Sequence, residues 1–82
     1  MCKRMFISND DPAMAYILGL LNGPRGSQSI TDLATATGIG VARVEQVIMV
    51  AERSGFVRAK QSTTMTRWEL TADGFRRLTD AA

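Results

Sequence analysis

The feature that most constrains the fold of this chain is the tripeptide Gly38-Ile39-Gly40, which lies between two segments with helical spacing. Glycine adopts left-handed backbone conformations without strain, so this tripeptide predicts a tight turn with Ile39 as its one buried residue. The segment before it begins at Thr31, a good N-cap residue, and Asp32 follows in the first turn, where it complements the helix dipole. A short helix, a glycine turn and a new helix together predict a helix-turn-helix unit.

The segment after this tripeptide predicts a longer helix, from about Val41 to Ser54, ended by Gly55. At 100° per residue its apolar stripe is formed by Val44, Val47, Ile48 and Ala51. The opposite side, expected to face solvent, carries Ala42, Glu45, Gln46, Met49 and Arg53, with Arg43 and Val50 at its flank.

Two strands are expected next, over residues 56–60 and 65–70, joined by a polar turn at residues 61–64. In the returning strand Trp68 and Leu70 are most simply interpreted as core residues.

A last helix is expected after the hairpin, from Ala72 to about Thr79, with Thr71 as its cap. Phe75 and Leu78 are expected to pack back against the body of the domain.

The first part of the chain predicts one more helix, begun by Asp10 or Asp11 with Pro12 at its first position and ended at residues 22–26. The polar link at residues 27–30 can contribute one short strand. We expect an N-terminal arm at residues 1–9 and one domain at residues 10–82. The predicted fold class is α+β, mainly α, with a three-helix core, a β-hairpin and a short C-terminal helix.

Composition excludes several classes of function. The 82 residues contain no histidine and a single cysteine, Cys2, so the common catalytic triads and cysteine-rich zinc sites are not available. We expect no enzyme activity, no metal and no cofactor. The longest apolar run, residues 13–21, is too short to span a bilayer, and Lys3 and Arg4 precede only a short apolar patch. A cytoplasmic protein without membrane contact is therefore expected.

Charge is distributed unevenly, although the net charge is only +2. Between residues 53 and 68 the chain carries Arg53, Arg58, Lys60 and Arg67 and no acidic residue. Such a cluster is commonly a solvated hairpin face, and its position beside a helix-turn-helix unit is what favours a nucleic-acid surface.

Three motifs resemble small bacterial and archaeal winged-helix regulators of the MarR, ArsR and PadR type. They are the Gly38-Ile39-Gly40 turn followed by Val44 and Ile48, the segment at residues 52–57, and the segment at residues 68–74. In those families the second motif ends the recognition helix and the third closes the wing. The resemblance covers roughly residues 30–78 and implies a winged helix-turn-helix that binds double-stranded DNA.

The resemblance places helix 41–54 in the major groove, where its first turns would present Val41, Ala42, Arg43, Glu45 and Gln46. Arg43 can donate to guanine and Gln46 can pair with adenine. Thr31 can offer its hydroxyl and the helix N-terminal amides to a phosphate. The wing would be formed by Lys60, Gln61, Ser62, Thr63 and Thr64, on the DNA backbone or in the minor groove. Arg58 and Arg67 would flank it.

The chain departs from the family pattern at two positions on this helix. Glu45 stands where a small hydroxyl residue is usual, and Met49 stands where lysine or another polar residue is common. Two hypotheses therefore stay open. The first is a sequence-specific DNA-binding regulator, a repressor acting as a homodimer with no evident small-molecule effector. The second is a winged-helix module that contacts proteins, as an adaptor or a phage- or plasmid-type accessory protein.

Overall fold

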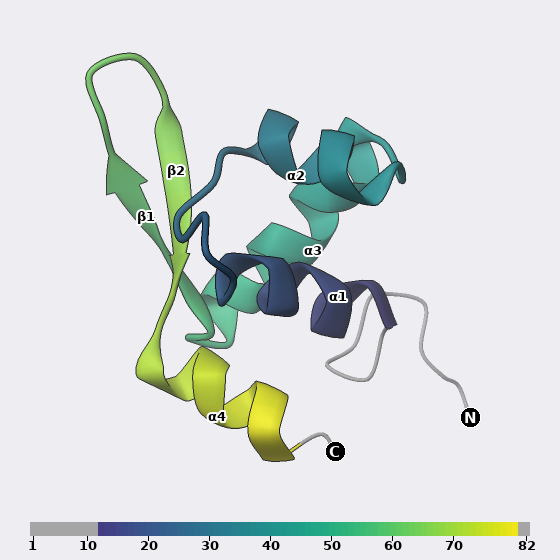
Figure 1. Cartoon of the computed structure of the whole chain (residues 1–82), viewed down its shortest axis with the longest axis vertical. Coiled ribbons are helices and arrows are strands. Elements are labelled where there is room, and N and C mark those ends of the chain that lie inside the picture. Colours follow the sequence, from purple (N-terminus) through teal and green to yellow (C-terminus); the bar gives the residue numbers. More distant parts are fainter. Residues whose placement is uncertain (1–11, 81–82) are drawn as a thin grey trace.

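Four helices and one β-hairpin make up the computed structural model, which describes residues 12–80 (Figure 1). In chain order they are α1 Pro12–Leu21, α2 Ile30–Thr37, α3 Val41–Arg53, β1 Val57–Gln61, β2 Thr66–Leu70 and α4 Ala72–Asp80. The predicted fold class, a mainly helical winged helix-turn-helix, is confirmed. The expected arm at residues 1–9 and the expected cap at Asp10 or Asp11 lie outside the described residues, and the domain boundary stays a prediction.

The first three helices enclose the core. The side chains with at most 1% exposure include Met14, Ile17, Leu18, Leu33, Val44, Val47 and Ile48. Full burial of each large apolar side chain stabilises the fold by about 1.5–3 kcal/mol. Trp68, Leu70 and Leu78 pack against this cluster from the hairpin and α4 and are partly buried. The predicted inward stripe of α3 and the predicted packing of Trp68 and Leu70 are both confirmed.

The Gly38-Ile39-Gly40 tripeptide turns the chain sharply between α2 and α3, whose axes differ by 117°. Gly38 has φ 74° and caps α2, with its N–H donating to the Ala34 carbonyl, and Gly40 has φ 93°. Ile39 is 39% exposed, so the expectation that it is buried was wrong. With both flanking glycines in the left-handed region, the turn carries Ile39 away from the core. Within residues 12–80, no single helix is long and apolar enough to cross a membrane, and only α2 and α3 together, across their bend, have the length and composition.

The hairpin is antiparallel, with Val57 opposite Leu70 and Gln61 opposite Thr66. Its turn is closed by the Ser62 N–H, which donates to the Met65 carbonyl at 3.1 Å. The strands begin and end within one residue of the predicted bounds. The link before α2 does contribute strand pairing, as one isolated bridge: Gln28 and Trp68 exchange main-chain hydrogen bonds of 3.0 and 2.8 Å.

The cap of α2 is Ser29, so the prediction of Thr31 was wrong. Ser29 has an extended backbone, its Oγ accepts from the Asp32 N–H at 3.1 Å, and its own N–H donates to Asp32 Oδ2 at 3.4 Å. This reciprocal pair is a capping box, which needs an acceptor three residues after the cap. Asp32 stands three residues after Ser29, whereas Thr31 lies inside the first turn.

The last helix is capped by Thr71 as predicted, because the Gly74 N–H donates to Thr71 Oγ1 at 3.0 Å. The expectation that Phe75 packs inward was wrong, since it is 50% exposed. Gly74 instead occupies the inward position, where an added Cβ would lie 2.1 Å from the Phe56 carbonyl oxygen. Leu78, four residues on, shares that face and is partly buried as predicted, while Phe75 is turned by about 100° to the side.

Candidate nucleic-acid interface

The outward side of α3 is solvent-exposed along its whole length. Val41, Ala42, Glu45, Gln46, Met49 and Arg53 are all exposed, as the helical spacing predicted for every one of them except Val41. The helix begins at the α2–α3 turn, and Gly40 at its start supplies no side-chain cap. The first turns of α3 therefore present side chains, with no other described element covering them, at the position expected of a recognition helix.

Arg43 differs from its neighbours on this helix. It lies at the flank of the outward side, is half-buried, and already interacts with another group of the chain. Its partly buried side chain is less open to a base edge than a fully exposed one. Among the polar residues of the first two turns, Gln46 and Glu45 are therefore the most openly displayed.

The wing carries an exposed polar tip. Lys60, Gln61, Ser62, Thr63 and Thr64 are all exposed, and Lys60 is paired with Arg67 in the register of the two strands. In Figure 1 the tip of the hairpin and α2 lie in the upper half of the molecule, whereas α4 lies at the bottom. The wing and the helix-turn-helix thus share one end of the domain, and α4 occupies the other.

Arg58 and Arg67 each have a partner within the chain. Arg58 Nε forms an ion pair with Glu69 on the neighbouring strand, and Arg67 Nη1 donates to the Ser27 carbonyl at 3.1 Å. Sequence reasoning placed both residues beside the wing, which is where they lie. It missed their intramolecular partners, because pairing across strands depends on the register and Ser27 is distant in sequence.

Thr31 is exposed on the first turn of α2. One main-chain amide that a phosphate could have used at this helix end, that of Asp32, donates instead to Ser29 Oγ. Ser29 was not among the predicted site residues. The signal that could have found it is the spacing Ser29-Ile30-Thr31-Asp32, which matches a capping box.

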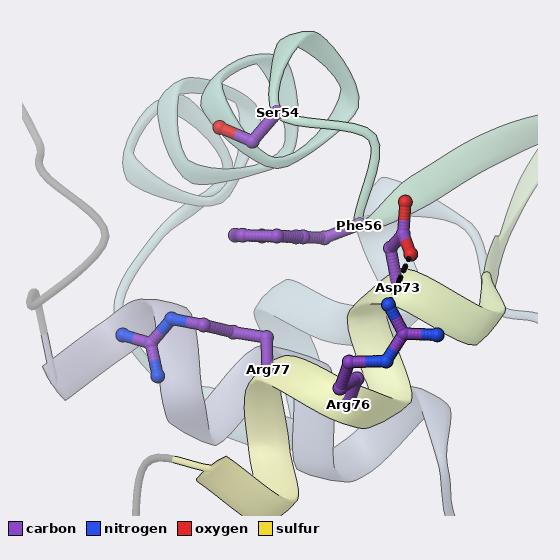
Figure 2. Close-up of a pocket in the computed structure, with 5 residues that line it drawn as sticks. All are labelled: Ser54, Phe56, Asp73, Arg76 and Arg77. Carbon is purple, nitrogen blue, oxygen red and sulfur yellow. Dashed lines mark hydrogen bonds and ion pairs between the residues drawn. The ribbon is translucent and has the colours of Figure 1, made fainter.

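A shallow hollow of about 270 Å³ lies at the end of α3 that is remote from the α2–α3 turn. Figure 2 shows its lining, Ser54, Phe56, Asp73, Arg76 and Arg77, with the Phe56 ring between α3 and α4. Arg76 Nη1 pairs with Asp73 at 3.3 Å. Within the described part of the chain, no three histidine, cysteine, aspartate or glutamate residues are grouped so that they could hold a metal ion.

Comparison with known proteins places this geometry in a class. No protein-family model and no curated protein matches the sequence. Solved structures do match. The adhesin competence repressor of Streptococcus pyogenes is 25% identical over 85% of this chain and 53% of its own, with a TM-score of 0.77. A MarR family protein from Bacillus stearothermophilus is 18% identical over 85% of this chain and 49% of its own, with a TM-score of 0.78.

A third match is BpsR of Bordetella bronchiseptica, at 23% identity over 90% of this chain and 54% of its own, with a TM-score of 0.81. Its DNA binding is described as regulated by 6-hydroxynicotinic acid. The chain spans about half the length of these proteins. It has the winged helix-turn-helix fold of MarR-type transcriptional regulators, as the sequence resemblance implied.

These neighbours are regulators and not enzymes, which agrees with the prediction that this chain is not an enzyme. Because BpsR responds to a small molecule, the prediction that this chain has no effector stays a prediction.

Proposed function

We propose that this protein is a transcriptional regulator that binds double-stranded DNA in a sequence-specific way. The observation that carries the proposal is that the tip of the wing lies at the same end of the domain as α2 and the start of α3 (Figure 1), and that both the wing and the first turns of α3 carry exposed side chains. A major groove admits one α-helix, and base edges are read by the N-terminal part of that helix. Val41, Ala42, Arg43, Glu45 and Gln46 are the residues that α3 would bring to the bases.

The wing supplies the contacts that do not depend on sequence. Lys60 is exposed and contributes a positive charge for a phosphate or for the minor groove. The polar groups of residues 61–64 and of Thr31 can donate to phosphate oxygens. Arg67, next to the tip, adds positive potential because its partner is a neutral carbonyl, whereas the charge of Arg58 is balanced by Glu69.

The protein is expected to act as a homodimer, to function as a repressor and to be cytoplasmic. One domain of this size makes few phosphate contacts, and a second copy doubles them on a palindrome whose half-sites lie one helical turn apart. The S. pyogenes neighbour is described as a repressor. Molar mass in solution, measured with and without duplex, tests the dimer directly.

The function is tested by titrating duplex DNA at several salt concentrations. We expect binding to weaken as salt rises, and Lys60→Ala to reduce the slope of log K against log salt by about 0.9 if Lys60 neutralises one phosphate. Arg76→Ala is the matched control, because this cation lies on α4 and is paired with Asp73. It should leave the slope unchanged.

Absence of binding to any duplex at low salt would reject the proposal. That result would support the alternative function, a winged-helix module that contacts proteins. The neighbouring structures do not favour this alternative.

A further inference from the structure

Three residues form the most outward line of α3: Ala42, Gln46 and Met49. They are spaced by four and three residues, so their side chains follow one another along a single face of the helix. All three are exposed, and Met49 is 58% exposed. The amide of Gln46 is thus displayed with one apolar side chain on each side of it, and no charged residue stands on the line before Arg53.

The chemistry of this line matches A·T base pairs. A glutamine amide can both donate to adenine N7 and accept from adenine N6, while the C5 methyl of thymine is the apolar group in the major groove. Guanine offers two acceptors, which call for a cation. Arg43 is the nearest cation in the first turns, and it lies at the flank of this line, where it is partly buried.

Glu45, beside the line of Ala42, Gln46 and Met49, also affects which bases α3 can contact. It is exposed and flanks the line on the side away from Arg43. A carboxylate accepts hydrogen bonds, so it is repelled by the O6 and N7 acceptors of guanine and can accept from the amino group of adenine or cytosine. Glu45 therefore disfavours guanine on the strand that it faces, and the preference for A·T pairs rests on Gln46, Ala42 and Met49.

We propose that α3 reads an A·T-rich half-site, with Gln46 on an adenine and with Ala42 and Met49 against thymine methyl groups on either side of it. From residue 42 to residue 49 the helix advances about 10 Å, which corresponds to about three base-pair steps. This inference rests on the proposed function, since it requires α3 to lie in the major groove.

The experiment first selects preferred duplexes from a random pool and then replaces their thymines, one at a time, by deoxyuridine. Deoxyuridine pairs as thymine does but lacks the C5 methyl. Each contacted methyl should contribute about fourfold to affinity, as expected for one buried carbon group. Substitution of 7-deazaadenine at the adenine should weaken wild-type binding and have no further effect on Gln46→Ala.

Variants assign the methyl contacts to residues. Met49→Ser and Ala42→Ser should each abolish the deoxyuridine effect at one thymine and keep it at the other. Thr79→Ser, on the exposed side of α4, is the matched control and should keep both effects. Circular dichroism confirms that each variant is folded, which is expected because Ala42 and Met49 are exposed.

The outcomes separate this inference from the proposed function. Failure to select any duplex, with no salt-dependent binding, rejects the proposed function. Selection of a duplex that binds equally well with deoxyuridine at every thymine overturns the inference and leaves the proposed function intact. A deoxyuridine effect that persists in both serine variants overturns it as well, because other side chains would then contact the methyl groups.

Discussion

Arg67 on β2 donates a hydrogen bond from Nη1 to the main-chain carbonyl of Ser27, 3.1 Å away and 40 residues distant in sequence. The next residues on the two segments, Trp68 and Gln28, are bonded through their main chains. Gln28 is buried, and its Nε2 donates to the carbonyl of Leu20 at the end of α1. The wing is therefore fastened to the segment that joins α1 to α2, so its direction relative to the helix-turn-helix is fixed.

Arg67→Met should loosen this attachment. The substitution removes one charge-assisted hydrogen bond from a half-buried site, and we expect a loss of about 1–2 kcal/mol in the free energy of unfolding. Thermal unfolding followed by circular dichroism measures it. Arg58→Met is the control, since its ion pair with Glu69 is on the surface and should contribute less than about 1 kcal/mol. Equal effects of the two variants would contradict a special role for the Arg67 contact.

Ser29→Ala should destabilise the fold by about 1 kcal/mol, because it removes the side chain that caps α2. For a domain of this size that corresponds to a fall in Tm of about 4–8 °C. Thr31→Ala should leave Tm nearly unchanged, because the Thr31 side chain is exposed on the first turn of α2 and does not cap it. The same variant should weaken DNA binding if the Thr31 hydroxyl contacts a phosphate. A larger loss of Tm for Thr31→Ala than for Ser29→Ala would be inconsistent with the capping box.

Gly74→Ala should be strongly destabilising, by about 2–4 kcal/mol. Its Cβ would lie 2.1 Å from the Phe56 carbonyl oxygen and 2.7 Å from Leu70 Cδ1, so α4 would have to move away from the body. Gly19→Ala, in α1, meets nothing within 4 Å and should stabilise the protein by about 0.5–1 kcal/mol. Denaturant unfolding of the two variants gives opposite signs if the packing is as described.

Ile48→Ala should lower the free energy of unfolding by about 2–5 kcal/mol, because Ile48 is 1% exposed within the core cluster. Val41→Ala, at a position that is 47% exposed, should change stability by less than about 0.5 kcal/mol. The same denaturant titration compares them. Comparable losses would mean that the start of α3 is covered in solution, for example by a second copy of the chain.

Much of the fold could be predicted from sequence because its signals are local and periodic. The inward stripe of α3 follows from the spacing of Val44, Val47, Ile48 and Ala51, and the α2–α3 turn follows from Gly38 and Gly40. The placement of Lys60 and the polar tip on the wing follows from the two segments predicted as strands and the polar run between them.

Two errors were local, since the glycine conformations decide the exposure of Ile39 and the capping box decides between Ser29 and Thr31. The others arose where a close contact between distant segments decides the outcome. Phe75 was expected inside because it is large and apolar, yet α4 approaches Phe56 so closely that only Gly74 fits at the inward position. The partner of Arg67 could not be predicted either, since nothing near residue 67 in the sequence indicates the Ser27 carbonyl.

Close to the contact at Gly74, hydrogen bonds also connect the start of α4 to the end of α3. Thr71 Oγ1 donates to the Gly55 carbonyl at 2.6 Å, the Thr71 N–H donates to the Phe56 carbonyl at 3.0 Å, and the Phe56 N–H donates to Ala51 in the last turn of α3 at 2.8 Å. These hydrogen bonds join the start of α4 to the last turn of α3 without an unbonded linker between them. We therefore expect the two helices to keep their relative orientation when a partner contacts α4.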